Sequence, residues 1–139
     1  MEKTLVILKP DAIQKNLIGE VFKRLEDDGL EIIDAKMTTL TEAQAGVFYA
    51  EHEGKGFYEG LIDFMTSGPV LPAVIAGKDA IKRVRLLMGE TDPQEAAPGT
   101  IRAEFADGMP NNIIHGSDSP ESARREISFF FSECEMINE

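Results

Sequence analysis

One of the two histidines in this 139-residue chain stands in a setting that suits nucleophilic chemistry. His115 ends the short apolar segment Asn112-Ile113-Ile114 and is followed directly by Gly116-Ser117-Asp118-Ser119. Glu126 falls on the helix expected after this segment, where its carboxylate can hold one ring nitrogen and orient the other. Ser117 offers a further hydrogen-bond partner near the ring. A structural histidine fits the same residues, so the pattern alone leaves a catalytic and a structural role for His115 open.

Three cationic side chains are placed where they would suit a polyphosphate. Lys9 directly follows the first expected strand, Arg85 lies near the end of a helix, and Arg102 lies in a long irregular segment. Thr91 and Thr100 supply hydroxyl groups near them. Guanidinium groups match pairs of phosphate oxygens, and an ammonium group adds a point charge. Solvated surface cations are the alternative interpretation of each.

Composition and missing motifs exclude several classes of function. The chain has 14 Lys and Arg against 25 Asp and Glu, a formal net charge of −11, which argues against nucleic-acid and anionic-membrane surfaces. A lone cysteine, Cys134, excludes an intrachain disulfide and a multi-cysteine zinc site. The sequence contains no Walker A motif and no G-x-S-x-G motif. With no signal-peptide pattern and no apolar run of membrane-spanning length, we expect a cytoplasmic protein.

Apolar periodicity and turn residues predict the elements that must position these side chains. In chain order they are a strand at 4–8, a helix at 17–25 ended by Gly29, a strand at 30–40, helices opening at Thr41 and near Phe57, a strand at 70–75, a helix at 81–88, a long loop at 90–112, a short strand at 113–114 and a helix after Ser119. Pro72 predicts a bulge or strand end. His52, between two glutamates on a polar helix end, is expected at the surface.

This order of elements is the β-α-β-β-α-β pattern with added helices. It predicts an α+β, ferredoxin-like sandwich in one domain over residues 1–139. We expect an antiparallel four-stranded sheet covered by helices on one face, with the long loop at the active site.

The segment around His115 closely resembles the signature N-x-x-H-G-S-D-S of nucleoside diphosphate kinases. The resemblance extends over nearly the whole chain, and its other blocks are Lys9-Pro10-Asp11, Phe64-Met65-Thr66-Ser67-Gly68-Pro69-Val70, Met88-Gly89-Glu90-Thr91-Asp92-Pro93, Pro98-Gly99-Thr100-Ile101-Arg102 and Glu121-Ser122-Ala123. Each block is specific, and they occur in the family's order.

The resemblance implies a role for each matching residue. His115 matches the histidine that is phosphorylated on Nδ1, Glu126 the glutamate on its other nitrogen, and Ser117 the serine near the ring. Tyr49 matches the tyrosine beside the γ-phosphate. The implied ligands of the nucleotide's phosphates, ribose and base are Lys9, Arg85, Thr91, Arg102, Asn112, Phe57, Met109 and Leu61; Phe57 is the ring that stacks on the base.

The implied activity is Mg²⁺-dependent, ping-pong transfer of the γ-phosphoryl group of a nucleoside triphosphate, typically ATP, to a nucleoside diphosphate. Mg²⁺ is expected on the nucleotide's phosphates and not on protein ligands. A base held by stacking alone implies tolerance of many bases. A catalytically silent nucleotide-binding module and a protein-histidine phosphotransfer partner are the rival interpretations.

Two departures from the family pattern bear on these expectations. Gly56 stands where a proline usually precedes the stacking phenylalanine, which would loosen Phe57. The C-terminus after Phe131 is short, as in many bacterial members, and longer members use that tail in hexamer contacts. We therefore expect a homo-oligomer and favour a tetramer or dimer over a hexamer.

Overall fold

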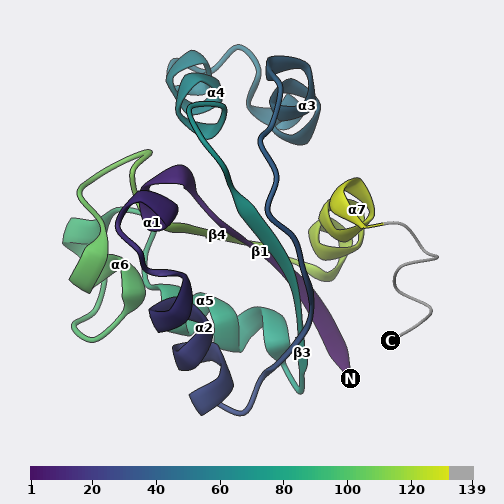
Figure 1. Ribbon diagram of the computed structural model, residues 1–139, viewed down its shortest axis with the longest axis vertical. Coiled ribbons are helices and arrows are strands. Elements are labelled where there is room, and N and C mark those ends of the chain that lie inside the picture. The colour runs from purple at the N-terminus through teal and green to yellow at the C-terminus, as the bar shows by residue number, and fades with distance from the viewer. Residues whose placement is uncertain (132–139) are drawn as a thin grey trace.

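Four strands form one antiparallel sheet, and helices pack around it (Figure 1). The structure, a computed structural model, describes residues 1–131; Cys134 and the rest of the tail at 132–139 lie outside the described residues. In chain order the elements are β1 (Glu2–Leu8), α1 (Pro10–Gln14), α2 (Ile18–Asp27), β2 (Glu31–Ala35), α3 (Glu42–Phe48), the 3-10 helix η1 (Ala50–His52), α4 (Tyr58–Met65), β3 (Leu71–Gly77), α5 (Ala80–Met88), the 3-10 helix η2 (Pro93–Glu95), α6 (Ile101–Phe105), β4 (Ile114–Gly116) and α7 (Pro120–Phe130). Among residues 1–131, no helix is both long and apolar enough to cross a bilayer.

The strand order is β2-β3-β1-β4, so β1 and β3 form the centre of the sheet. β1 pairs antiparallel with β3 over its whole length, and its second half pairs antiparallel with β4. This is the split β-α-β arrangement, and the predicted fold class is confirmed. His115 lies opposite Ile7 in the β1–β4 pair. The histidine is therefore at the sheet edge next to the end of β1, where Lys9 follows.

Both faces of the sheet are covered, so the expectation of helices on one face is wrong. Alternate residues of β1 point to opposite faces. Val6 and Leu8 join a core cluster with α2 and α5, whereas Leu5 and Ile7 join another with α3, α4 and α7. Figure 1 shows α2 and α5 on one side and α7 on the other. A strand buried on both faces needs apolar side chains at nearly every position, which explains the continuous run in this segment.

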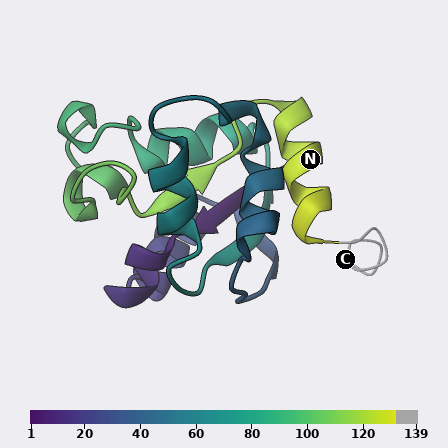
Figure 2. The same ribbon diagram turned by 90° about the horizontal axis from the view of Figure 1, so that it is seen from above.

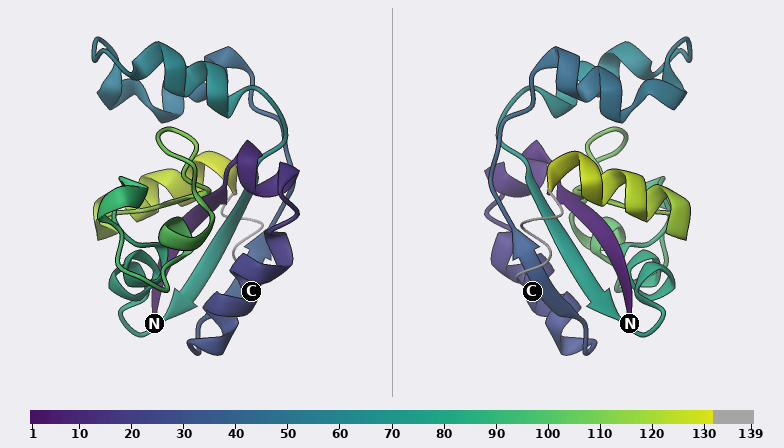
Figure 3. Two further views of the ribbon diagram at one scale, coloured as in Figure 1. Left: turned by 90° about the vertical axis from the view of Figure 1, so that its left-hand side faces the viewer. Right: turned by 90° about the vertical axis from the view of Figure 1, so that its right-hand side faces the viewer.

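Helices α3 and α4 form a pair that stands at one end of the sheet. Seen from above, the pair crosses the sheet with α7 on one side and the segment 90–112 on the other (Figure 2). Figure 3 shows the same pair beyond the end of the sheet, with the loop between α6 and β4 rising toward it. Residues of the α3–α4 pair and residues of this loop therefore approach the same end of the sheet from two sides.

The long segment 90–112 contains two short helices and is not the continuous loop that we expected. The Asp92 side chain caps η2 by accepting from Gln94 N, and the Thr100 hydroxyl caps α6 by accepting from Ala103 N. Each helix is too short to show an apolar period in the sequence. The same reason explains α1, which begins with Pro10 at a position where proline favours helix initiation.

Strand β2 is shorter than expected: it ends at Ala35, and its pairing with β3 shifts in register between Ile32 and Asp34. Beyond it, Thr38 makes an isolated bridge to Val70. Pro72 lies at the second position of β3, beyond the end of β2, where its carbonyl accepts a hydrogen bond from Lys36 N. This location agrees with the predicted strand end.

Both predicted helix starts with side-chain caps are present. Thr41 Oγ1 accepts from Gln44 N at 3.1 Å, and Gln44 Oε1 accepts from Thr41 N at 3.0 Å. Ser119 Oγ accepts from Ser122 N at 3.1 Å at the start of α7. These caps satisfy N–H groups that the helices leave free and fix where α3 and α7 begin.

Gly116 allows α5 to pack directly against β4. A Cβ atom built on Gly116 would lie 2.5 Å from Met88 Sδ and 3.4 Å from Val84 Cγ1. Met88 is 1% exposed, so its side chain has no free space to move into. Gly116 is not among the glycines with positive φ. Close packing against α5 therefore requires glycine beside His115.

We predict that Gly116→Ala lowers the free energy of unfolding by about 1–3 kcal/mol, because the added methyl group overpacks the contact with Met88. Gly19→Ala in α2 is the matched control, since a Cβ there meets nothing within 4 Å. It should raise the same free energy by up to about 1 kcal/mol through helix propensity. Urea unfolding followed by circular dichroism measures both. An alanine at position 116 without cost would mean that α5 can move away from β4.

Candidate active site

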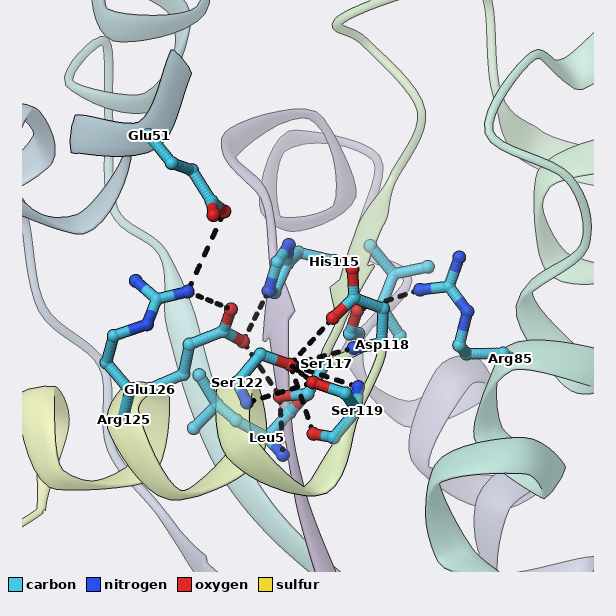
Figure 4. Close-up of polar contacts among 12 residues, drawn as sticks. Leu5, Glu51, Arg85, His115, Ser117, Asp118, Ser119, Ser122, Arg125 and Glu126 are labelled. Atoms are coloured by element: carbon cyan, nitrogen blue, oxygen red, sulfur yellow. Dashed lines mark hydrogen bonds and ion pairs between the residues drawn. The ribbon is translucent and has the colours of Figure 1, made fainter. Parts of the chain in front are cut away.

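Strand β4 and helix α7 hold the predicted nucleophile and its carboxylate side by side (Figure 4). His115 Nε2 lies 2.8 Å from Glu126 Oε1, and Ser117 Oγ donates to the same oxygen at 2.7 Å. Ser117 is oriented in turn by β1, because its Oγ accepts from Leu5 N at 3.4 Å. The side chain of Glu126 is 6% exposed and that of His115 is 22% exposed. The carboxylate is therefore buried, while the ring still reaches solvent.

The contact with Glu126 determines which ring nitrogen of His115 is nucleophilic. An ionised carboxylate only accepts hydrogen bonds, so Nε2 must carry the hydrogen. In a neutral imidazole the lone pair is then on Nδ1. Within residues 1–131, Nδ1 makes no hydrogen bond, so its lone pair is available to an electrophile.

Glu126 keeps its charge at neutral pH although it is buried. Burial favours the neutral acid, but hydrogen bonds from His115 and Ser117 and the nearby positive charges outweigh it and lower the pKa of Glu126. Arg125 Nη2 lies 3.6 Å from Glu126 Oε2 and 3.7 Å from Glu51 Oε1 (Figure 4). Arg125, which the sequence gave no reason to single out, thus links α7 with η1.

Lys9 is almost completely buried, which is unusual for an ammonium group. Its Nζ donates to Asn112 Oδ1 at 2.6 Å, and Asn112 Nδ2 donates to Thr91 O at 2.9 Å. Burial first, and then the charge of Arg102, lower the pKa of Lys9 to about 7, while the Asp11 carboxylate acts in the opposite direction. A nearby anion would favour the charged form and raise this pKa again.

Arg102 on α6 ties the long segment to β4. It is buried, and it donates to three backbone carbonyls: Asn112 O at 3.3 Å, Gly89 O at 3.0 Å and Ile114 O at 2.6 Å. Burial and the charge of Arg85 lower its pKa to about 10, so the guanidinium stays charged at neutral pH. The structure therefore brings Arg102, Asn112 and Lys9 together.

Ile113 has the unusual backbone torsion φ of 75°, a rare conformation for a β-branched residue. Ile114 N donates to Asn112 O at 2.9 Å across it, which is the hydrogen bond of a γ-turn. Ile113 N donates to Asp11 Oδ2 at 3.0 Å, and Lys9 N donates to Ile113 O at 2.8 Å. The segment after β1 thus holds both peptide groups of the strained residue.

The carboxylate that holds Ile113 belongs to a residue without a predicted role. Asp11 is 4% exposed, and burial raises its pKa despite hydrogen bonds from the backbone. In the sequence, Asp11 is part of the block Lys9-Pro10-Asp11 that resembles the family, so the resemblance could have pointed to it. Nothing in the sequence indicates the backbone torsion of Ile113.

Arg85 lies on the opposite flank of the histidine segment. The side chain projects from α5, and its Nη1 donates to Gly116 O at 3.1 Å (Figure 4). Asp118 lies nearby, and its pKa is lowered first by a hydrogen bond from the Ser122 hydroxyl and also by the charge of Arg85. Arg85 is exposed, so its guanidinium can reach a bound anion.

Two aromatic rings pack against the imidazole from the side of α3. The Tyr49 ring is perpendicular to that of His115 at 6.4 Å between centroids, and the Phe48 ring lies at 5.5 Å. The Tyr49 hydroxyl is buried, and it has no hydrogen-bond partner within the described part of the chain. Burial and the negative charge of Glu126 raise its pKa, so the hydroxyl stays protonated and can donate to a ligand.

His52 lies at the surface only in part, since its side chain is 31% exposed and its ring is packed. Its ring stacks on that of Tyr49, with 6.2 Å between centroids and 28° between planes, and it lies 5.4 Å from the ring of Phe57. The polar neighbours Glu51 and Glu53 concealed this packing in the sequence.

The remaining predicted ligands are Phe57 and Leu61, at the start of α4 and within it, and Thr91 and Met109, in the segment 90–112. Phe57, just before α4, is 55% exposed, and Met109, between α6 and β4, is 60% exposed. Leu61 is 9% exposed in the core cluster beneath α4, and Thr91 is exposed with its carbonyl bonded to Asn112. The nucleotide-binding roles of all four stay predictions.

Two cations of the first helices anchor the segment that carries Arg102. Lys15 Nζ donates to Phe105 O and to Asp107 Oδ2, each at 2.8 Å. Arg24 forms an ion pair with Glu104 and lies 5.0 Å from the centre of the Phe105 ring. Sequence analysis did not single out either cation, because both lie far from this segment along the chain.

A shallow hollow of about 650 Å³ lies beside α5 and includes Arg85, but His115 and Lys9 do not line it. We place the site at the polar cluster and not at this hollow, because the hollow lacks a nucleophile with an oriented carboxylate.

Comparison with known proteins agrees with this geometry. The family model for nucleoside diphosphate kinase matches residues 2–136. A crystal structure of the Aquifex aeolicus nucleoside diphosphate kinase is 48% identical with a TM-score of 0.93, and the match covers 96% of this chain and 97% of that one. A halophilic nucleoside diphosphate kinase from Halobacterium salinarum in complex with CDP is 47% identical with a TM-score of 0.93, and the match covers 96% of this chain and 90% of that one. The family match spans nearly the whole sequence and agrees with the motif around His115, so the chain belongs to the nucleoside diphosphate kinase family.

Proposed function

We propose that this nucleoside diphosphate kinase transfers the γ-phosphoryl group through a phosphohistidine formed on His115 Nδ1. The observation that carries the proposal is the 2.8 Å hydrogen bond between His115 Nε2 and Glu126 Oε1. It leaves the lone pair of Nδ1 on the side away from Glu126. A covalent intermediate divides the exchange between two nucleotides into two displacements at one site.

In the first displacement, Nδ1 attacks the γ-phosphorus, the Nδ1–P bond forms, and the bond from phosphorus to the β,γ-bridging oxygen breaks. The nucleoside diphosphate leaves with that oxygen. In the second, a terminal oxygen of another diphosphate attacks the phosphohistidine and returns the electron pair to Nδ1. Glu126 stabilises the positive charge that the ring carries while Nδ1 is substituted.

The cations around His115 are proposed to bind the nucleotide's phosphates. Phosphoryl transfer depends on positioning and on neutralising charge on the transferred oxygens. Lys9 and Arg102 are buried on one flank, and Arg85 is exposed on the other. The Tyr49 hydroxyl, buried next to the imidazole without a partner in residues 1–131, is a suitable donor to the γ-phosphate.

Mg²⁺ fits this site as a companion of the nucleotide. Residues 1–131 contain no group of three or more His, Cys, Asp or Glu side chains arranged to hold a metal ion. The ligands of Mg²⁺ would therefore be phosphate oxygens and water, which this ion prefers. When bound, the ion supplies charge neutralisation across the β- and γ-phosphates.

We further propose that the enzyme is cytoplasmic.

We also propose that the base of the nucleotide stacks on Phe57 and that Met109 lies on its other face. Phe57 and Met109 are exposed on segments that approach each other above the end of the sheet (Figure 3). Stacking depends little on the identity of the base.

We predict that incubation with Mg·ATP and no acceptor gives an acid-labile phosphoryl adduct on His115. His115→Ala should give no adduct, and Glu126→Gln should slow its formation on the order of 10²-fold, because the negative charge opposite Nε2 is lost. Intact-protein mass spectrometry and rapid-quench kinetics measure the two effects.

Arg124→Gln is the matched control on α7, because Arg124 is exposed and lies two residues from Glu126. It should form the adduct at the normal rate. An adduct on serine, or an unchanged rate in Glu126→Gln, would contradict the proposed roles.

We predict that nucleotide binding is coupled to proton uptake by Lys9. The pKa of Lys9 is lowered to about 7 in the free protein, so a growing fraction is neutral above that pH. A polyphosphate raises this pKa, so binding adds protons above about pH 7 and adds few well below it. Affinity should accordingly fall as pH rises from about 7 toward the higher pKa of the complex.

Calorimetry of Mg·ADP binding in two buffers of different ionisation enthalpy measures the proton uptake. Lys9→Arg keeps its charge throughout, so the difference between the two proteins removes the nucleotide's own titration. Equal uptake by both proteins at pH 8 would show that Lys9 is charged before the ligand arrives.

Finally, we propose a homo-oligomer, a tetramer or dimer in preference to a hexamer. We propose that a subunit contact helps to order the segment 90–112; Lys15 and Arg24, which anchor it within one chain, offer an alternative explanation of its order. The tail that bears on the hexamer lies outside the described residues.

We predict that assembly still supports activity, since subunit contacts stabilise the folded chain by mass action. Sedimentation velocity across a dilution series, paired with activity at each concentration, tests this. A fully active monomer at every concentration would mean that the intrachain anchors are sufficient.

A further inference from the structure

The ring of His52 lies between the two functional ends of the site. It stacks on Tyr49 at 6.2 Å and approaches Phe57 at 5.4 Å, and Tyr49 in turn meets His115 at 6.4 Å. These four rings form a continuous series of contacts. One end is the phosphoryl acceptor, and the other end is the exposed ring proposed to stack on the base.

Phe57 is the N-cap of α4, where its carbonyl accepts from Leu61 N at 3.0 Å, but the segment before it is rich in glycine. The residues before it are Gly54-Lys55-Gly56, and a Cβ at either glycine would meet nothing within 4 Å. Gly54 also has a φ of +90°, which only glycine adopts readily. Glycine leaves the chain many accessible conformations, so side-chain contacts add to the backbone hydrogen bonds in fixing the Phe57 ring.

Two side chains lie next to the Phe57 ring, and of these His52 is held in place by its own packing. Lys55 Nζ lies 5.9 Å from the centre of the Phe57 ring, but Lys55 is itself exposed. The His52 side chain is 31% exposed and rests on Tyr49, which is 6% exposed in the core cluster under α3 and α4. Of the two neighbours, His52 therefore links Phe57 to the rigid part of the protein.

The contacts of His52 with Tyr49 and Phe57 are made by its ring surface. Nδ1 is buried and has no partner among residues 1–131. Nε2 lies 3.9 Å from Glu51 Oε1, beyond hydrogen-bond distance, on a carboxylate that is 63% exposed. An aromatic ring without nitrogen atoms could make the same contacts with Tyr49 and Phe57.

We propose that His52 is a positioning residue for the base of the nucleotide, acting through Phe57. The proposal rests on the proposed stacking of the base on Phe57. By fixing that ring relative to Tyr49 and His115, His52 keeps the base platform at the correct distance from the phosphoryl acceptor. Loss of the ring should weaken ligands in proportion to their stacking area and leave base-free polyphosphates unaffected.

The test compares the affinities of Mg·ADP, Mg·CDP and Mg·tripolyphosphate by calorimetry. His52→Ala should weaken ADP binding about 5- to 10-fold, with a smaller loss for CDP, and should not change tripolyphosphate binding. His52→Phe should bind all three as the unmodified chain does, because it keeps a ring. His52→Leu, an apolar side chain without a ring, should behave like the alanine variant and replaces it if that protein does not fold.

Two further variants make the result specific. Val47→Ala, at an exposed position of α3, controls for general perturbation of the helix pair and should change no affinity. Phe57→Ala should lose ADP affinity at least as strongly as His52→Ala. If Phe57→Ala has no effect, the proposed base site is wrong; if only Phe57→Ala has an effect, the base site stands and the role of His52 is overturned. An equal loss of tripolyphosphate affinity in His52→Ala would also overturn it, since the effect would then be structural.

Discussion

The chemistry of the site depends on one hydrogen bond, from His115 Nε2 to an ionised carboxylate at 2.8 Å. It selects the tautomer, orients the ring and stabilises positive charge on it, so small displacements between β4 and α7 would disturb all three. Several neighbouring features restrict such displacements. Ser117 bridges Glu126 to β1, Ser119 caps the first turn of α7, and Gly116 lets α5 pack closely on the other side of the strand. The tight packing around this strand is thus a requirement of the chemistry as well as of stability.

The proposed phosphate-binding cluster of Lys9 and Arg102 lies in a chain with a formal net charge of −11. An acidic surface repels a polyphosphate, so attraction must come from cations that are close and poorly screened. Lys9 and Arg102 meet this condition because both are buried. While no anion is bound, the Asn112 amide oxygen accepts a hydrogen bond from Lys9, and backbone carbonyls accept hydrogen bonds from Arg102. Neutral oxygen atoms suit this purpose, since a carboxylate in their place would compete with the ligand.

Local patterns in the sequence were sufficient for the parts of the site that lie close together along the chain. His115 and Glu126 are separated by a predictable strand end and helix start, and the capped start of α7 confirms that geometry. The fold class followed from the order of the longer elements. Three features could not be predicted from such patterns. The torsion of Ile113 leaves no compositional trace, α6 is too short to show a period, and the polar neighbours of His52 concealed a packed ring. The burial of Lys9 depends on contacts with residues about a hundred positions away and is a tertiary property.

The γ-turn at Ile113 connects the two halves of the site and explains why strain is tolerated there. A torsion of this kind costs about 1–3 kcal/mol. Buried hydrogen bonds to Asp11 and from Lys9 N offset it, each contributing about 1 kcal/mol or more. The turn sets Asn112 against the Lys9 ammonium group on one side and leads into His115 on the other. With a relaxed, extended backbone at Ile113, the chain at Asn112 would point in a different direction relative to the chain at His115. The strained residue therefore fixes the distance between Lys9 and His115, the proposed phosphate-binding cation and nucleophile, and the residues directly after β1 hold that turn.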